Sequence, residues 1–234
     1  MAELGGSLDA WGDAQMPIGL IGRRWWLGAV LAMTATAAVC GEAAFPATKV
    51  LPLLEAYLSL PPAQRSHFRP AYLLHAKAGS LAGAQAWYEV DGRRMPVALG
   101  ADGRLARTPD LAQLRRGVKL GLKTAEGVKV GLKMDLEAIV PATPRMDARA
   151  LDEALTQATE GGRKAGGLAA FTAPQLDVAV FAGAGAGEAV YADGRRAPLA
   201  SRGGDPAYDR KHQKGALTIV LQRAPSVVRL EGRN

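Results

Sequence analysis

The chain has 234 residues, of which 48% are hydrophobic and 6% aromatic, and it contains 28 glycines. This composition excludes a disordered or fibrous chain and is sufficient for one or two domains with cores of their own. The net charge of +7 and the pI near 9.8 favour anionic partners such as lipid head groups, lipopolysaccharide or acidic polysaccharide.

Residues 1–40 have the pattern of a secretory signal peptide. Arg23 and Arg24 precede an apolar run that ends at Val39, and small residues follow. The run is shorter than the roughly 20 residues that a membrane-spanning helix needs. We therefore expect export to the periplasm.

Two export routes are compatible with this segment. Arg23-Arg24 followed by Trp25, Trp26 and Leu27 is similar to a twin-arginine signal, but Gly22 and Gly28 depart from that pattern. The general secretory route is therefore favoured.

Cys40 is the only cysteine and would be lost with the signal, so the exported chain needs no disulfide. Val39 is a poor residue before a lipidated cysteine, which argues against a lipoprotein. Residues 41–234 retain 27 basic and 19 acidic residues, a net charge of +8, so the basicity belongs to the folded part.

Residues 45–68 are predicted to be helical. Leu51, Leu54 and Leu58 recur at helical spacing, and Pro61-Pro62 ends the helix because the residue before a proline avoids the helical conformation. Pro62 itself suits the start of a further turn.

Residues 69–141 read as a first β repeat, with strands in "AYLLHAK", "AQAWYEVD" and "RMPVA". Asp91-Gly92 indicates a two-residue type I′ hairpin, because both residues tolerate positive φ. This register sets Glu89 opposite Arg94, where we expect an ion pair, and Tyr88 opposite Met95.

The segments "GVKLGLKT" and "VKVGLKM" alternate apolar and polar residues and predict a second hairpin around a three-residue loop at 125–127. In that register Lys123 faces Lys129, and Lys119 faces Lys133. Like charges in direct opposition destabilise a sheet, so the four lysines Lys119, Lys123, Lys129 and Lys133 are the candidate anion-binding face. The alternative is a solvated face whose lysines prevent edge pairing.

Residues 146–172 are predicted to be a helical connector, with Asp147 as the N-cap and an end at Gly161-Gly162. Residues 173–234 then read as a second β repeat. The string Asp-Gly-Arg-Arg-x-Pro recurs at Asp193, and "GALTIVLQ" and "SVVRLE" predict a closing hairpin.

The recurrence predicts a mainly β fold built from two internally duplicated, small antiparallel β units, sandwich-like and joined by the helical connector. Leu217, Ile219 and Leu221 match Val118, Leu120 and Leu122 in register. Whether the units form one sandwich or two domains is left open by the periodicity.

No catalytic, cofactor or metal motif is present in the sequence. His67, His75 and His212 lack ligand spacing, and the glycines of "FAGAGAGEAVY" precede a strand rather than a helix, which argues against a phosphate loop. We expect no cofactor and no metal.

The strings "LPPAQRSHFRPAY", "DGRRMP", "KAGGLAAFTAP" and "GAGAGEAVYADGRRAPL" resemble a group of exported α-proteobacterial proteins of unknown function. The resemblance covers most of the chain beyond the signal. It implies a periplasmic location, no known activity and no functional residues.

The favoured hypothesis is a non-enzymatic periplasmic or envelope-associated binding or scaffold protein with a basic face for an anionic envelope component. The alternative is a periplasmic hydrolase that acts on a polymer at a site between the two β units. Nucleic-acid binding is not expected, because aromatic residues are not interleaved with the basic face.

Overall fold

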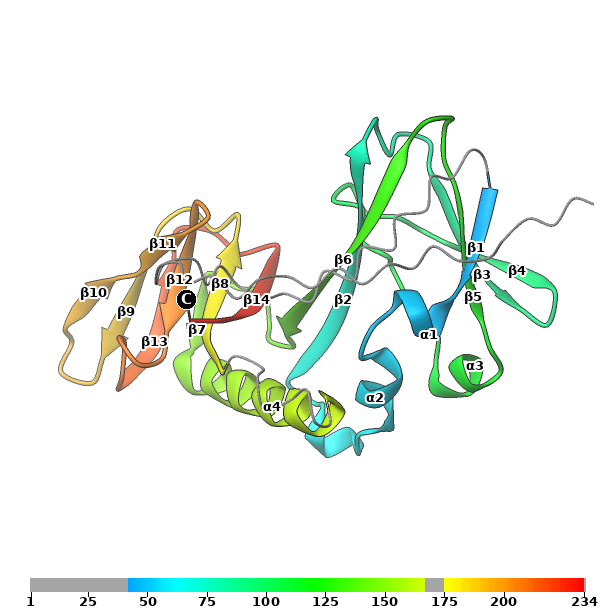
Figure 1. The fold of residues 1–234 in the computed structure, drawn as a ribbon. Helices are drawn as coiled ribbons and strands as arrows, with labels where there is room; N and C mark the ends of the chain where they lie inside the picture. Colours follow the sequence, from blue (N-terminus) through cyan, green and yellow to red (C-terminus); the bar gives the residue numbers. More distant parts are fainter. Residues whose placement is uncertain (1–41, 167–174, 234) are drawn as a thin grey trace, which may run out of the picture.

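The computed structural model describes residues 42–166 and 175–233. Within them the fold is mainly β, as predicted, and consists of three antiparallel sheets (Figure 1). The predicted signal peptide and residues 167–172 of the predicted connector lie outside the described residues.

The first unit is built from two facing sets of strands. One sheet has the order β1 (Glu42–Pro46), β5 (Lys119–Lys123), β3 (Gln85–Val90), β4 (Arg93–Val97). Facing it, β2 (Phe68–Ala78) pairs with β6 (Lys129–Ala138). The short helices are α1 (Ala47–Val50), α2 (Leu54–Ser59), η1 (Pro62–Gln64) and α3 (Leu111–Arg115).

The second unit repeats this plan. Its own sheet has the order β7 (Arg145–Asp147), β13 (Ala216–Leu221), β9 (Gly187–Tyr191), β10 (Arg196–Pro198). Here β8 (Leu176–Ala182) pairs with β14 (Val227–Gly232). The helix α4 (Ala148–Gly166) follows β7 directly, and β11 (Ala200–Arg202) and β12 (Asp205–Asp209) are additions without a counterpart.

Strand order and chain order therefore agree between the two copies. Each copy runs from an edge strand through helix to a long strand, then a hairpin, and then a strand in each sheet. The repeated unit begins at β1 and β7, so α4 occupies the place of α1 and α2 rather than lying between the copies.

A shared sheet joins the units. Strands β8, β14, β6 and β2 lie side by side in one six-stranded sheet that β12 and β11 extend. The equivalent strands β6 and β14 are antiparallel neighbours, with Leu136 opposite Leu230 and Glu137 opposite Arg229. This is the arrangement that a twofold axis perpendicular to the sheet produces. The molecule is thus two face-to-face units fused through one continuous sheet.

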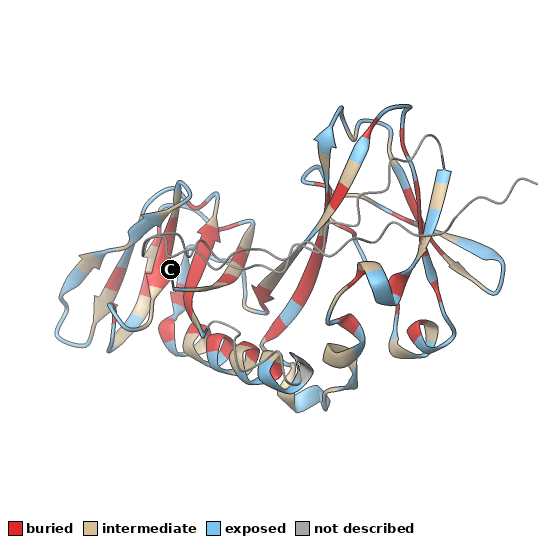
Figure 2. Ribbon diagram, viewed as in Figure 1, coloured by how far each residue is buried: buried red, intermediate tan, exposed pale blue. Residues whose placement is uncertain are grey.

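Two main cores fill the units (Figure 2). The first lies between the β1-β5-β3-β4 sheet and the β2–β6 pair and includes Tyr72, Tyr88 and Leu120. The second lies under α4 and includes Leu151, Phe181 and Ile219, together with Phe68 from the first unit. Because Phe68 of β2 belongs to the second core, apolar packing also crosses the boundary between the copies.

The two predicted closing hairpins are wrong. Strand β5 pairs with β1 and β3, whereas β6 pairs with β2 and β14. In the second copy β13 pairs with β7 and β9, and β14 pairs with β8 and β6. The predicted alternation of apolar residues holds except at Leu217, which is exposed, but the two strands line one core from opposite sides instead of bonding to each other.

The repeated Asp-Gly-Arg-Arg-x-Pro string forms two different turns. Asp91 and Gly92 both have positive φ, and Val90, Glu89 and Tyr88 oppose Arg93, Arg94 and Met95 as predicted. In the second copy the Tyr191 N–H bonds to the Arg195 carbonyl, so three residues form the loop and only Gly194 has positive φ. The extra residue shifts the register by one position and keeps Ala189 in the core.

The predicted helices also differ from the observed ones in detail. The helix predicted from the spacing of Leu51, Leu54 and Leu58 is interrupted at Pro52. Leu53 adopts a left-handed conformation with φ of 63°. Asp147 accepts a bond from the Arg149 N–H at the start of α4, as an N-cap does. However, α4 continues past Gly161 to Gly166. A Cβ at Gly161 would lie 2.6 Å from the Phe68 ring. Gly161 therefore serves close packing rather than helix termination.

Candidate functional site

The four predicted lysines do not form one face. Lys119 and Lys123 lie on β5, whereas Lys129 and Lys133 lie on β6 in a different sheet. The proposed cross-strand lysine pairs are absent because β5 and β6 are not paired. The Glu89–Arg94 ion pair is also absent, since Glu89 contacts Lys119 and Arg94 contacts Glu42.

Two of these lysines belong to a different basic surface, which we call the basic ribbon: His75 and Lys77 of β2 with Lys129 and Lys133 of β6. Strand β14 pairs with β6 only at Leu136 and Glu137, so the earlier part of β6 projects with β2 as a two-stranded ribbon (Figure 1). All four side chains are exposed.

Gly131 shapes this surface. A Cβ at Gly131 would lie 2.5 Å from the His75 ring and 2.9 Å from Cε of Lys77. The His75 and Lys77 side chains therefore lie against the backbone of β6 between Lys129 and Lys133. Lys133 is paired with Asp135 at 2.9 Å, whereas among the described residues Lys77 and Lys129 take part in no ion pair.

The pattern Lys-x-Gly-x-Lys occurs on β6 at residues 129–133 and again on β5 at residues 119–123. On β5 an aromatic ring lies over the glycine of the pattern. Trp87 of β3 opposes Gly121, and a Cβ at Gly121 would lie 2.1 Å from the indole. The Arg94 guanidinium lies 4.7 Å from the centre of the Trp87 ring. Lys119 and Lys123 are exposed on the same face of β5.

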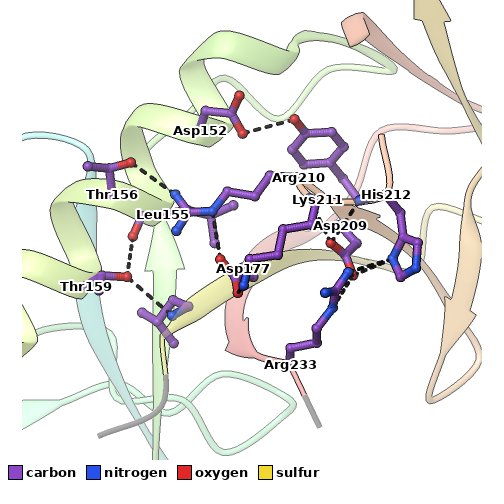
Figure 3. Close-up of polar contacts among 12 residues, drawn as sticks. Asp152, Leu155, Thr156, Thr159, Asp177, Asp209, Arg210, Lys211, His212 and Arg233 are labelled. Atoms are coloured by element: carbon purple, nitrogen blue, oxygen red, sulfur yellow. Dashed lines mark hydrogen bonds and ion pairs between the residues drawn. The ribbon is translucent and has the colours of Figure 1, made fainter. Parts of the chain in front are cut away.

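A polar cluster ties the turn after β12 to β8 and α4 (Figure 3). The Asp177 carboxylate is 1% exposed and forms ion pairs with Arg210 at 2.8 Å and with Lys211. Burial alone would raise the pKa of Asp177, but hydrogen bonds and charge from Lys211 and Arg210 lower it. Arg210 also donates to Thr156 of α4. The cluster therefore fixes the turn against the helix.

Asp209 and His212 form the one Asp–His pair in this cluster. His212 Nδ1 lies 2.8 Å from Asp209 Oδ2, and Arg233 donates to the same carboxylate. Burial would raise the pKa of Asp209, but bonds from His212, Arg233 and two backbone N–H groups lower it to about 2. The His212 side chain is 72% exposed. The carboxylate thus anchors the turn and the end of the chain.

Asp152 of α4 is the exception among these acids. Burial raises its pKa, which outweighs the bond from the Tyr208 hydroxyl at 2.9 Å and the charge of Arg210. The Tyr208 pKa is raised in turn by burial and by the neighbouring Asp152. This pair is a buried structural contact between α4 and β12.

The junction between the units holds a buried charge. Glu137 of β6 is fully buried and pairs with Arg104 and with Arg69. Its strand neighbour Arg229 on β14 pairs with Asp205 and Glu231. The described junction between the units therefore contains compensated ion pairs.

An open groove of about 560 Å³ is lined by residues of β7, of the start of α4 and of β13. Its lining includes Arg145, Arg149 and Leu217. Leu217 is 56% exposed, although its counterpart Val118 is 2% exposed, because a bulge between Ala216 and Thr218 turns Leu217 outward. The register match predicted for Leu217 thus fails, while Ile219 and Leu221 are buried like Leu120 and Leu122.

Within the part of the chain that the structure describes, no group of three or more His, Cys, Asp or Glu side chains is arranged to hold a metal ion. None of the helices described is long and apolar enough to cross a membrane.

Comparison of the chain with protein-family models, with curated proteins and with solved structures finds no match.

The sequence analysis did not predict strands β11 and β12 or the ion pairs that depend on them. The signal was present, because Gly203-Gly204 is a two-residue hairpin turn and both glycines have positive φ. The pairing of Asp177 with Arg210 and Lys211 depends on β12 lying beside β8, a contact that periodicity does not reveal.

Proposed function

We propose that this chain is an exported, non-enzymatic binding protein that attaches through the basic ribbon to a phosphate-bearing component of the bacterial envelope. The carrying observation is the placement of Lys77, Lys129 and Lys133 on one open face of a projecting ribbon, two of them without an ion-pair partner among the described residues. A cluster of lysines near an anionic surface gains about 1 kcal/mol for each residue.

Two carboxylates of the polar cluster serve as structural anchors. Asp177 and Asp209 have lowered pKa values because cationic side chains bond to them, so both stay ionised at neutral pH and hold the turn after β12 in place. The predicted secretory signal and the net positive charge of residues 41–234 are consistent with a partner in the envelope.

Co-sedimentation tests this proposal. The full chain is mixed with anionic phospholipid vesicles, with lipopolysaccharide or with neutral vesicles, at low and physiological salt. The variant Lys77→Gln/Lys129→Gln/Lys133→Gln is compared with Lys49→Gln/Lys164→Gln/Lys214→Gln, which changes the net charge equally at exposed positions elsewhere.

We expect the ribbon variant to bind on the order of a hundredfold more weakly than the native chain, and the control variant to lose far less. Binding should also weaken as salt rises, because exposed charges are screened. Preference for vesicles or for lipopolysaccharide identifies the source of the phosphate. Equal losses in the two variants would contradict a site on the ribbon.

A further inference from the structure

The outer face of the β1-β5-β3-β4 sheet carries a tryptophan that lies flat on the backbone. Trp87 opposes Gly121, and a side chain at position 121 would collide with the indole, because its Cβ would lie 2.1 Å from Cε2 of Trp87. Ala44 opposes Gly121 on the other side. Only small residues flank the ring along this row of β1 and β5, so one face of the indole rests on the sheet and the other points outward.

The Arg94 side chain lies over the ring. Arg94 stacks 4.7 Å from the ring centre and reaches across the sheet to the Glu42 carboxylate. The Arg94 and Glu42 side chains are 55% and 41% exposed. Ion pairs this exposed contribute little to stability, so the Arg94 side chain can leave the ring at a small cost in free energy.

The indole N–H donates no hydrogen bond to any of the residues that the structure describes. Trp87 is 6% exposed, and its Nε1 is one of two buried side-chain polar atoms that lack a hydrogen-bond acceptor among the described residues. Buried donors are almost always bonded, so an acceptor that reaches Nε1 would be favoured. Lys119 and Lys123 stand on either side of Gly121 and carry exposed ammonium groups beside this donor.

We propose that this face is a binding site for an acidic sugar residue of a polysaccharide. When Arg94 moves aside, the flat C–H face of a pyranose ring lies on Trp87 and a ring substituent accepts the bond from Nε1. The sugar carboxylate takes the place of Glu42 and is held by Arg94, Lys119 and Lys123.

The chemistry of the site selects this ligand. A free phosphate or acetate ion satisfies the cations but leaves the indole face bare. A neutral sugar covers the indole but cannot replace the Glu42 and Glu89 carboxylates that now pair with Arg94 and Lys119. A uronic acid supplies both a flat apolar face and a carboxylate. The proposal does not depend on the basic ribbon, because it uses a different sheet and different lysines.

Fluorescence of Trp87 tests the site directly. The chain has four tryptophans, so replacing Trp11, Trp25 and Trp26 by Phe in the full chain leaves Trp87 as the sole indole. This protein is titrated with polygalacturonate, with neutral dextran and with inorganic phosphate. We expect a saturable change in emission with polygalacturonate and none with dextran or phosphate.

Three variants, each checked for its fold by far-UV circular dichroism, sharpen the result. Lys119→Gln/Lys123→Gln should weaken polygalacturonate binding at least tenfold. The matched pair Lys129→Gln/Lys133→Gln, from the equivalent string on β6, should weaken the Trp87 response far less, because these lysines lie in another sheet. Glu42→Gln should tighten binding several-fold, because it removes the competing carboxylate.

Three outcomes would overturn the proposal. They are an unchanged Trp87 emission at high polygalacturonate concentration, an equal response to dextran, and equal weakening by the two lysine pairs. The last outcome would still be compatible with nonspecific attraction through the basic ribbon, so the failure of this site is distinguishable from failure of the proposed function.

Discussion

At the scale of single residues, three glycines allow an aromatic ring to lie directly against the backbone. Gly121 lies under Trp87, Gly131 under His75, and Gly161 under Phe68. The sequence shows each glycine but not the ring above it, because the ring comes from a strand or helix distant in the chain. This explains why Gly161 was interpreted as a helix end.

A matched pair in α4 tests this role of glycine. Gly161→Ala should lower the free energy of unfolding by about 1–3 kcal/mol, because the new Cβ would lie 2.6 Å from Phe68. Gly162 has open space around its Cα, so Gly162→Ala should raise it by about 0.5–1 kcal/mol through helix propensity. Urea unfolding measures both changes. Stabilisation by both substitutions would contradict the packing role of Gly161.

The pKa of Asp209 predicts a pH-dependent contribution to stability. It is lowered to about 2 in the folded protein, against about 4 in an unfolded chain, so its stabilisation is present above pH ~4 and is lost as pH falls toward 2. The difference in unfolding free energy between the native chain and Asp209→Asn should be about 2 kcal/mol at pH 6 and close to zero near pH 2.

Urea unfolding of both proteins at several pH values measures this difference. Asp193→Asn is a suitable control, because that side chain is 68% exposed and its ion pair is long at 3.9 Å. A difference for Asp209→Asn that stays constant down to pH 2 would contradict the proposed anchoring.

At the scale of secondary structure, alternation identified most of the residues that face the core, with Leu217 an exception, but not which strands pair. Lys119 and Lys129 both lie outward, as predicted, yet they are in different sheets. Successive strands joined by a short loop are usually neighbours, and here they instead cross from one sheet to the facing one. The candidate lysine face depended on that pairing and therefore could not be predicted correctly.

Glu137 lies on β6 where that strand pairs with β14, so its replacement tests how much the buried charge at this junction contributes to stability. Replacing Glu137 by Gln removes the buried charge that Arg69 and Arg104 bond to and should lower the free energy of unfolding by about 1–3 kcal/mol, because the two arginines are 61% and 24% exposed and remain solvated. Glu231→Gln at the same junction should cost about 1 kcal/mol or less, because Glu231 is 33% exposed. Equal costs, measured by urea unfolding, would contradict the structural role of Glu137.

At the scale of the whole molecule, the duplication could be predicted because the string Asp-Gly-Arg-Arg-x-Pro and a matching alternation recur in order. Its full extent could not, because β1 and β7 have little in common as sequences and α4 is much longer than α1 and α2. The shared sheet was also out of reach, since nothing in either repeat signals that β6 pairs with β14.

Fusion through one sheet and one shared core predicts cooperative unfolding. Trp87 reports on the first unit alone, whereas far-UV circular dichroism reports on both units. In the chain with Trp87 as its sole indole, the two signals should follow one urea transition with the same midpoint. Separate midpoints would mean that the copies behave as independent domains.

Hydrogen–deuterium exchange of the full chain, with and without anionic vesicles, tests the proposed function most directly because it locates the contact without mutation. We predict that bound vesicles slow exchange in residues 71–78 and 129–135, the strand segments that carry the basic ribbon. Exchange in the rest of the described chain should be unchanged. Protection confined to the groove beside β7, or no protection at all under conditions where the protein sediments with vesicles, would contradict the assignment of the ribbon as the binding surface.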